Sequence, residues 1–101
     1  MSRASLCAQI RLLVEACALK ALHPTSRQAI GSYDYRRRQI AFSYPTVSIH
    51  RMEAIAREHA AVRIEKGHGR TIRRAKKLAA ERKANAALQD IRLALEAMNA
   101  A

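Results

Sequence analysis

The sequence predicts a mainly α, single-domain protein of about three helices, in which a short β-hairpin is one interpretation of the segment between helix one and helix two. Apolar residues recur at helical spacing over most of the 101 residues. This length suffices for one hydrophobic core but not for two independent cores. Half of the residues are hydrophobic while only 4% are aromatic, and many are Ala. We therefore expect few bulky core side chains and closely approaching helices.

The first expected helix covers residues 3–22. Leu6 and Leu13 belong to a continuous apolar stripe, while Leu12 lies on the far side of the helix. A helix that is apolar nearly all round is buried on more than one face. We expect this helix to be the central core element or a subunit contact. Pro24 ends it, because Pro cannot continue the helical hydrogen bonds.

Residues 27–47 admit two main interpretations, with an irregular loop as a third. In the first, alternating apolar residues form a β-hairpin that carries Arg36, Arg37 and Arg38 at or near its turn, making a basic finger. In the second, the run Ala-Phe-Ser-Tyr-Pro-Thr-Val-Ser at residues 41–48 resembles the turn and recognition-helix start of a helix-turn-helix. That motif buries apolar side chains at two positions where this chain has Arg36 and Arg37.

The second half of the chain predicts two further helices, over residues 48–66 and 70–99. Gly67 and Gly69 should interrupt the helical pattern between them. In the first of these helices, Glu53 and the Arg four residues later are spaced to form an ion pair. In the helix over residues 70–99, the interruption places Arg73 and Arg74 in the first turn. The helix dipole disfavours cations there unless an anion binds.

The long helix is strongly basic in its first half. Residues 69–83 carry seven Arg or Lys against one Glu, and the whole chain has a net charge of +11. Clustered basic residues are the electrostatic footprint of nucleic-acid binding. We therefore predict a nucleic-acid-binding module that contacts phosphates of DNA or RNA through a basic helix stripe. The predicted nucleic-acid-binding residues are Arg36, Arg37, Arg38, Arg70, Arg73, Arg74, Lys76, Lys77, Arg82 and Lys83.

The second half of the long helix is nearly neutral and has a different apolar face. Leu88, Ile91, Leu95 and Met98 follow a 3,4,3 spacing on a side rotated by about half a turn from the apolar residues of the first half. A straight helix with two apolar faces has two partners. We therefore expect a homo-oligomer that forms through these four residues or through a helix-one surface.

The cysteines and charges restrict compartment and cofactors. Cys7 and Cys17 lie about 15 Å apart along one helix, too far for a disulfide, so we expect two buried free thiols in a cytoplasmic protein. No uncharged span is long enough for a membrane helix, so no membrane partner is expected. The Cys and His residues lack zinc spacing, and neither a metal nor a cofactor is expected.

Two other functions are compatible with the same composition. The first is a phage- or plasmid-type interaction or inhibitor protein that binds an acidic or nucleic-acid-binding surface of a host complex. The second is a small basic ribonuclease, with His68 or Tyr44 transferring a proton and Arg70, Arg73 or Lys77 stabilising the transition state. No carboxylate pair for general acid and base work is evident, so we do not expect an enzyme.

Overall fold

Four α-helices make up the fold in the computed structural model, which describes residues 3–100. The helices are α1 (Arg3–Leu22), α2 (Arg27–Ser43), α3 (Ile49–Lys66) and α4 (Arg70–Ala100). The mainly α class is therefore confirmed, with one helix more than expected. The ends of α1, α3 and α4 match the predicted ranges to within one residue.

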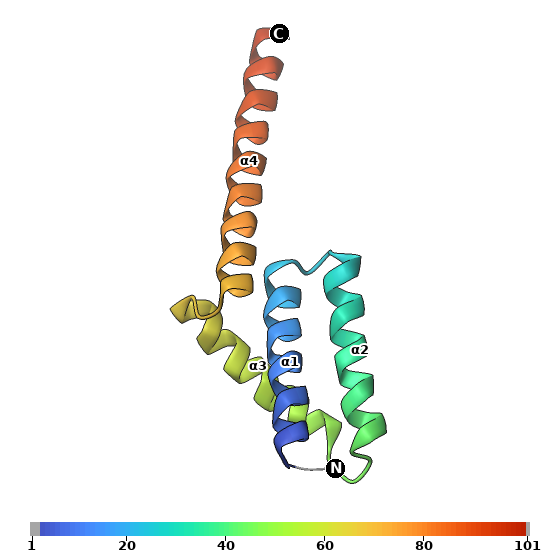
Figure 1. Ribbon diagram of the computed structural model, residues 1–101. Coiled ribbons are helices and arrows are strands. Elements are labelled where there is room, and N and C mark those ends of the chain that lie inside the picture. The colour runs from blue at the N-terminus through green and yellow to red at the C-terminus, as the bar shows by residue number, and fades with distance from the viewer. Residues whose placement is uncertain (1–2, 101) are drawn as a thin grey trace.

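Helix α1 is the element against which all the others pack. It contacts α2, α3 and α4, and Figure 1 shows α2 antiparallel beside it while α3 crosses it at an angle. Leu13 and Ala18 of α1 are completely buried. The expectation of a central first helix is confirmed, because the buried residues of α1 cover more than half of its circumference; Leu12, on the remaining side, is 38% exposed.

Small side chains fill most of the core. The largest fully buried side chains are Leu13, Ile40 and Ile72, contributed by α1, α2 and α4. Much of the remaining buried apolar set is Ala, including Ala56 and Ala60 of α3. Because the distance between packed helices depends on the side chains at the contact, these Ala residues allow the close approach expected from the composition.

The β-hairpin interpretation of residues 27–47 is wrong, because this segment forms helix α2. Ser26 caps the helix by accepting a hydrogen bond from the Ala29 amide at 3.2 Å. Tyr33 and Ile40 are buried on one side of the helix, where their spacing of seven residues brings them onto the same face. The aromatic residues that suggested alternating strands thus follow the helical period. Tyr33 is buried, whereas Tyr35 and Phe42 are exposed.

A short turn joins α2 to α3. Helix α2 ends at Ser43 and α3 begins at Ile49, after Ser48 has capped it through a 3.4 Å hydrogen bond from the Arg51 amide. Pro45 lies inside the turn and fits an interruption of the helix. Helix α2, this turn and α3 thus follow one another in the order of the second interpretation. No strand or hairpin occurs among residues 3–100.

Two glycines separate α3 from α4, as predicted. Gly67 is the C-cap of α3 and has a left-handed backbone, with φ of 66°. Gly69 has φ of 89°, and a Cβ atom added to it would lie 2.7 Å from Nη2 of Arg63. Residues other than Gly rarely adopt such backbone angles. The two glycines therefore allow the chain to turn here and start a new helix.

The two thiols differ in environment. Cys17 is buried as expected, and burial raises the pKa of its thiol. The expectation for Cys7 is wrong, because this residue is exposed. It lines an open groove of about 330 Å³ between α1 and α3 instead of packing inside the core.

Candidate nucleic-acid interface

Helix α4 projects far beyond the body formed by the other three helices. Figure 1 shows its C-terminal half clear of the other elements, and the molecule is 67 Å along its longest axis. Only Ile72 and Ala75 of α4 are buried, and residues 80–100 are all exposed. The helix is thus attached to the body by its first turns only.

Four of the predicted binding residues share one side of α4, and one of them, Arg74, also lines an open groove that α4 forms with α1 and the start of α2. Helical spacing places them opposite the buried Ile72, and all four are exposed. Among residues 3–100, both ion pairs are made by Glu53, so no carboxylate of this part of the chain neutralises these cations. We call this set the outward basic face; it consists of Arg70, Arg73, Arg74 and Lys77.

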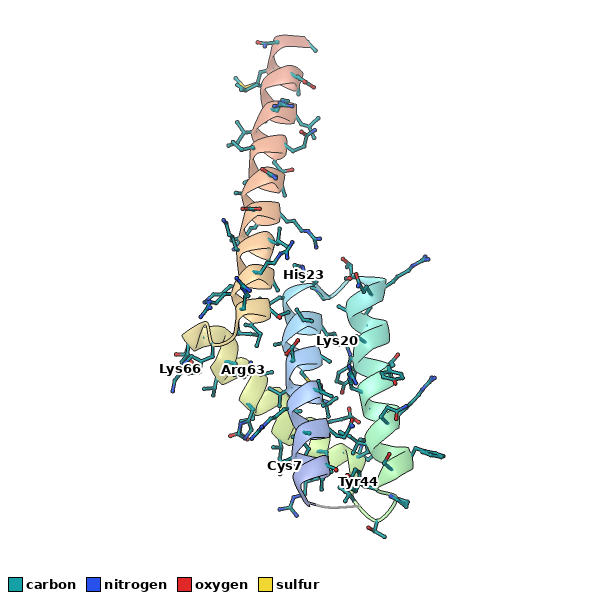
Figure 2. The ribbon with its side chains drawn as sticks, in the orientation of Figure 1. Cys7, Lys20, His23, Tyr44, Arg63 and Lys66 are labelled. Atoms are coloured by element: carbon teal, nitrogen blue, oxygen red, sulfur yellow. The ribbon has the colours of Figure 1, made fainter. Side chains whose placement is uncertain are left out.

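Two other predicted residues of α4 are turned toward the body and contact it. Lys76 Nζ donates a 3.0 Å hydrogen bond to the carbonyl oxygen of Ile64, at the negative end of the α3 dipole. Arg82 Nη1 lies 3.0 Å from Nδ1 of His23, which Figure 2 shows at the end of α1 beside α4. These two cations help to dock α4, while Lys83 is exposed and makes no ion pair within residues 3–100.

The three Arg residues of α2 do not form the turn of a basic finger, because they lie within a helix. Arg37 is half-buried and paired with Glu53, and the Arg36 guanidinium carbon lies 5.2 Å from the centre of the Tyr35 ring. Arg38 is exposed. Since α2 and α4 do not pack against each other in the described chain, this second group remains separate from the outward basic face.

A buried carboxylate explains how α2 accommodates an Arg toward the body. Glu53 is only 7% exposed and accepts hydrogen bonds from the Tyr33 hydroxyl at 2.6 Å and from Arg37 Nε at 2.5 Å. Arg57 also reaches it at 3.4 Å, which confirms the predicted ion pair. Lys20 Nζ lies 4.2 Å from the centre of the Tyr33 ring, between α1 and α2 (Figure 2). The cluster joins α1, α2 and α3 through polar contacts.

The polar cluster shifts the pKa values of its members. Burial alone would raise the pKa of the Glu53 carboxyl, but hydrogen bonds from Tyr33 and Arg37 outweigh burial and hold this pKa below its usual range. Burial and the hydrogen bond to Glu53 raise the pKa of Tyr33 to about 12. Both shifts keep the hydroxyl protonated and the carboxylate charged, which is the arrangement that the hydrogen bond requires.

Helix α2 carries an exposed aromatic pair that the strand interpretation did not place on one side. Tyr35 is 54% exposed and Phe42 is 87% exposed. They are seven residues apart and therefore share one side of the helix, with Arg38 between them. The spacing of seven would have revealed this pair had the segment been assigned as a helix. Exposed aromatic rings beside Arg side chains are the stacking platforms of single-strand binders.

The candidates for proton transfer do not come together. Tyr44 lies in the turn before α3 and His68 in the turn after it, so about 27 Å of helix separates the two. Of these two candidates, only His68 is close to Arg70 in the sequence. The Tyr44 hydroxyl is buried and has no hydrogen-bond partner among residues 3–100. Within residues 3–100, no group of three His, Cys, Asp or Glu side chains could hold a metal ion.

Comparisons with protein-family models, curated proteins and solved structures found no match for this chain. None of the helices in the described range has the length and apolar character that crossing a membrane requires.

Proposed function

We propose that this chain is a cytoplasmic nucleic-acid-binding module that contacts phosphates through the outward basic face of α4. One observation carries the proposal: four exposed cations lie on one side of a projecting helix, with no carboxylate of residues 3–100 paired to them. Concentrated charge of one sign that the fold does not neutralise attracts a polyanion over long range. Two free cysteines accord with a reducing compartment.

The dimensions of the outward basic face suit a phosphate backbone. From Arg70 to Lys77 the helix rises about 10 Å, which matches about three successive phosphates of one duplex strand. The first turn of α4 contains no acidic residue. Its free backbone N–H groups therefore add positive potential at the same end of the helix.

We expect the loss of Arg73 and Arg74 to weaken binding and to reduce its salt dependence. Phosphate contacts release condensed counterions, so the log-log slope of affinity against salt should flatten by roughly 1.8 for duplex DNA after Arg73→Ala with Arg74→Ala. The loss should be similar for all sequences, because backbone contacts do not read bases. Fluorescence anisotropy with labelled duplexes over a range of salt concentrations measures both quantities.

A matched control distinguishes the loss of the α4 interface from the loss of net charge. Arg11→Ala with Arg51→Ala removes the same charge from exposed positions of α1 and α3. This pair should change the slope much less. An equal loss in the control would show that the overall charge attracts the polyanion without an interface on α4. If neither DNA nor RNA binds at low salt, the charge serves a protein partner, as the interaction-protein alternative requires.

The exposed rings on α2 extend the proposal to single strands. Base stacking on an aromatic side chain contributes about 1–3 kcal/mol. We therefore expect Phe42→Ala to lower the affinity for single-stranded oligonucleotides roughly tenfold while leaving duplex affinity nearly unchanged. Phe42→Tyr retains a ring and is the control. An unchanged affinity of Phe42→Ala for single strands would remove this residue from the interface.

A further inference from the structure

The projecting half of α4 presents an apolar surface that no other part of residues 3–100 covers. Residues 81–100 are all exposed, including four large apolar side chains at a 3,4,3 spacing. Their exposed fractions lie between 55% and 73%. We call this set the apolar seam; it consists of Leu88, Ile91, Leu95 and Met98.

We infer that the apolar seam binds the same seam of a second copy of this chain, with the two α4 helices antiparallel. The spacing 3,4,3 reads the same in both directions. Leu88 can therefore lie opposite Met98 of the second copy while Ile91 lies opposite its Leu95, with the symmetry axis at residue 93. All four seam positions thus form layers, as the a and d positions of an antiparallel coiled coil do.

Charge favours the antiparallel direction. Arg73 and Ile91 are 18 residues apart, which is five full helical turns, so the outward basic face and the apolar seam lie on the same side of α4. A parallel pair would lay one basic face against the other and would place Lys77 and Glu81 beside their own copies. An antiparallel pair overlaps only from about residue 85 onward, where Asp90, Arg92 and Glu96 are the only charged residues. The strongly basic segments then lie at opposite ends of the dimer.

The charges beside the seam balance in this arrangement. With the symmetry axis at residue 93, the Arg92 side chains of the two copies come within about 3 Å of the same level, measured along the axis, and Glu96 of each copy has a similar offset from Arg92 of the other, so two carboxylates flank the two Arg side chains on one edge of the seam. In a parallel pair the residue facing Arg92 would be Ala87, which offers no charge. On the other edge of the seam, Ala87 and Ala94 are small enough to let the helices approach closely.

The inference is tested by sedimentation equilibrium in high salt without nucleic acid, so that the outcome does not depend on phosphate binding. The unmutated chain should change from monomer to dimer as its concentration rises through tens to hundreds of micromolar. Ile91→Asp with Leu95→Asp should weaken association by on the order of a hundredfold, because charged groups would enter the apolar layers.

A matched control uses a neighbouring Leu outside the seam. Leu93 is 52% exposed, close to the 57% of Ile91 and the 55% of Leu95, but it lies on a different side of the helix. Leu93→Asp should leave association nearly unchanged. Circular dichroism checks that each variant keeps its helices. A monomer at every concentration, a larger assembly, or an equal loss with Leu93→Asp would overturn the inference.

Spin-label distances test the direction of the pair. Labels are placed on Asn85→Cys or on Arg92→Cys, in a chain that also carries Cys7→Ser to remove the exposed native thiol. Both labelled positions occupy the same place in the seven-residue repeat. In an antiparallel dimer the offset along the axis is about 24 Å between the labels at 85 and about 3 Å between those at 92, so the labels at 85 should be farther apart by more than about 10 Å. A parallel dimer would give equal distances and would contradict the proposed register.

Discussion

Replacing Ile72 with Ala should lower the free energy of unfolding by about 2–5 kcal/mol, the range for large-to-small changes in a packed core. Ile72 is completely buried, and apart from Ala75 it is the one side chain that α4 buries within residues 3–100. The contacts of Lys76 and Arg82 with the body depend on the same docking. The effect should therefore extend to the whole attachment of α4.

Urea unfolding followed by circular dichroism measures this loss. Hydrogen exchange should show faster exchange in the first turns of α4 than in the core of α1, because the variant weakens docking before it weakens the body. Leu93→Ala is the control, since Leu93 lies on the exposed part of the same helix. Its cost should stay within about 0.5 kcal/mol. Equal costs for the two variants would contradict the attachment of α4 through Ile72.

Helical period and glycine were sufficient to predict three of the four helices. Residues 3–22, 48–66 and 70–99 correspond to α1, α3 and α4 with nearly the same ends. The reason is physical: the end of α1 and the junction of α3 with α4 lie beside residues that local sterics restrict, Pro24 and Gly67.

Helix α2 could not be assigned from its local pattern. Its alternating aromatic residues fit a strand as well as a helix, and Arg37 stands at a position that faces the body. A helix with this Arg becomes acceptable only when Glu53, sixteen residues away, supplies a buried carboxylate. Such a pairing depends on how α2 and α3 meet, and no local rule contains that information.

The candidate interface was predictable in part. The face formed by Arg70, Arg73, Arg74 and Lys77 follows from helical spacing, and the structure places these residues together as expected. The docking contacts of the other α4 cations do not follow from spacing within one helix. They depend on the ends of α1 and α3, where a His side chain and a carbonyl oxygen accept them.

The polar cluster around Glu53 should limit stability at both ends of the pH scale. The pKa of the Glu53 carboxyl is below its ordinary value of 4.5 in the folded chain, so its contribution is present above that value and is lost as pH falls through the folded pKa. The pKa of Tyr33 is raised from 10.0 to about 12, so its contribution is complete below pH 10.0 and is lost as pH rises toward about 12. The unfolded chain binds more protons on the acidic side and fewer on the alkaline side.

Two substitutions separate these limits. Glu53→Gln should cost on the order of 2 kcal/mol at neutral pH, because hydrogen bonds to a charged group are lost, and it should flatten the acidic decline. Tyr33→Phe should remove an alkaline decline on the order of 2 kcal/mol, which corresponds to the pKa shift of a residue that is only 6% exposed. The measurement is the free energy of unfolding in urea over a pH series, taken as the difference between each variant and the unmutated chain.

Glu58→Gln provides the control for the acidic limit, because Glu58 is exposed on the same helix as Glu53. It should change stability at neutral pH by no more than about 0.5 kcal/mol. If the curves of Glu53→Gln and the unmutated chain stay parallel from neutral to acidic pH, Glu53 does not carry its charge in the folded chain. Arg37 would then have no ionic partner among residues 3–100, and α2 would lose the contact that accounts for an Arg facing the body.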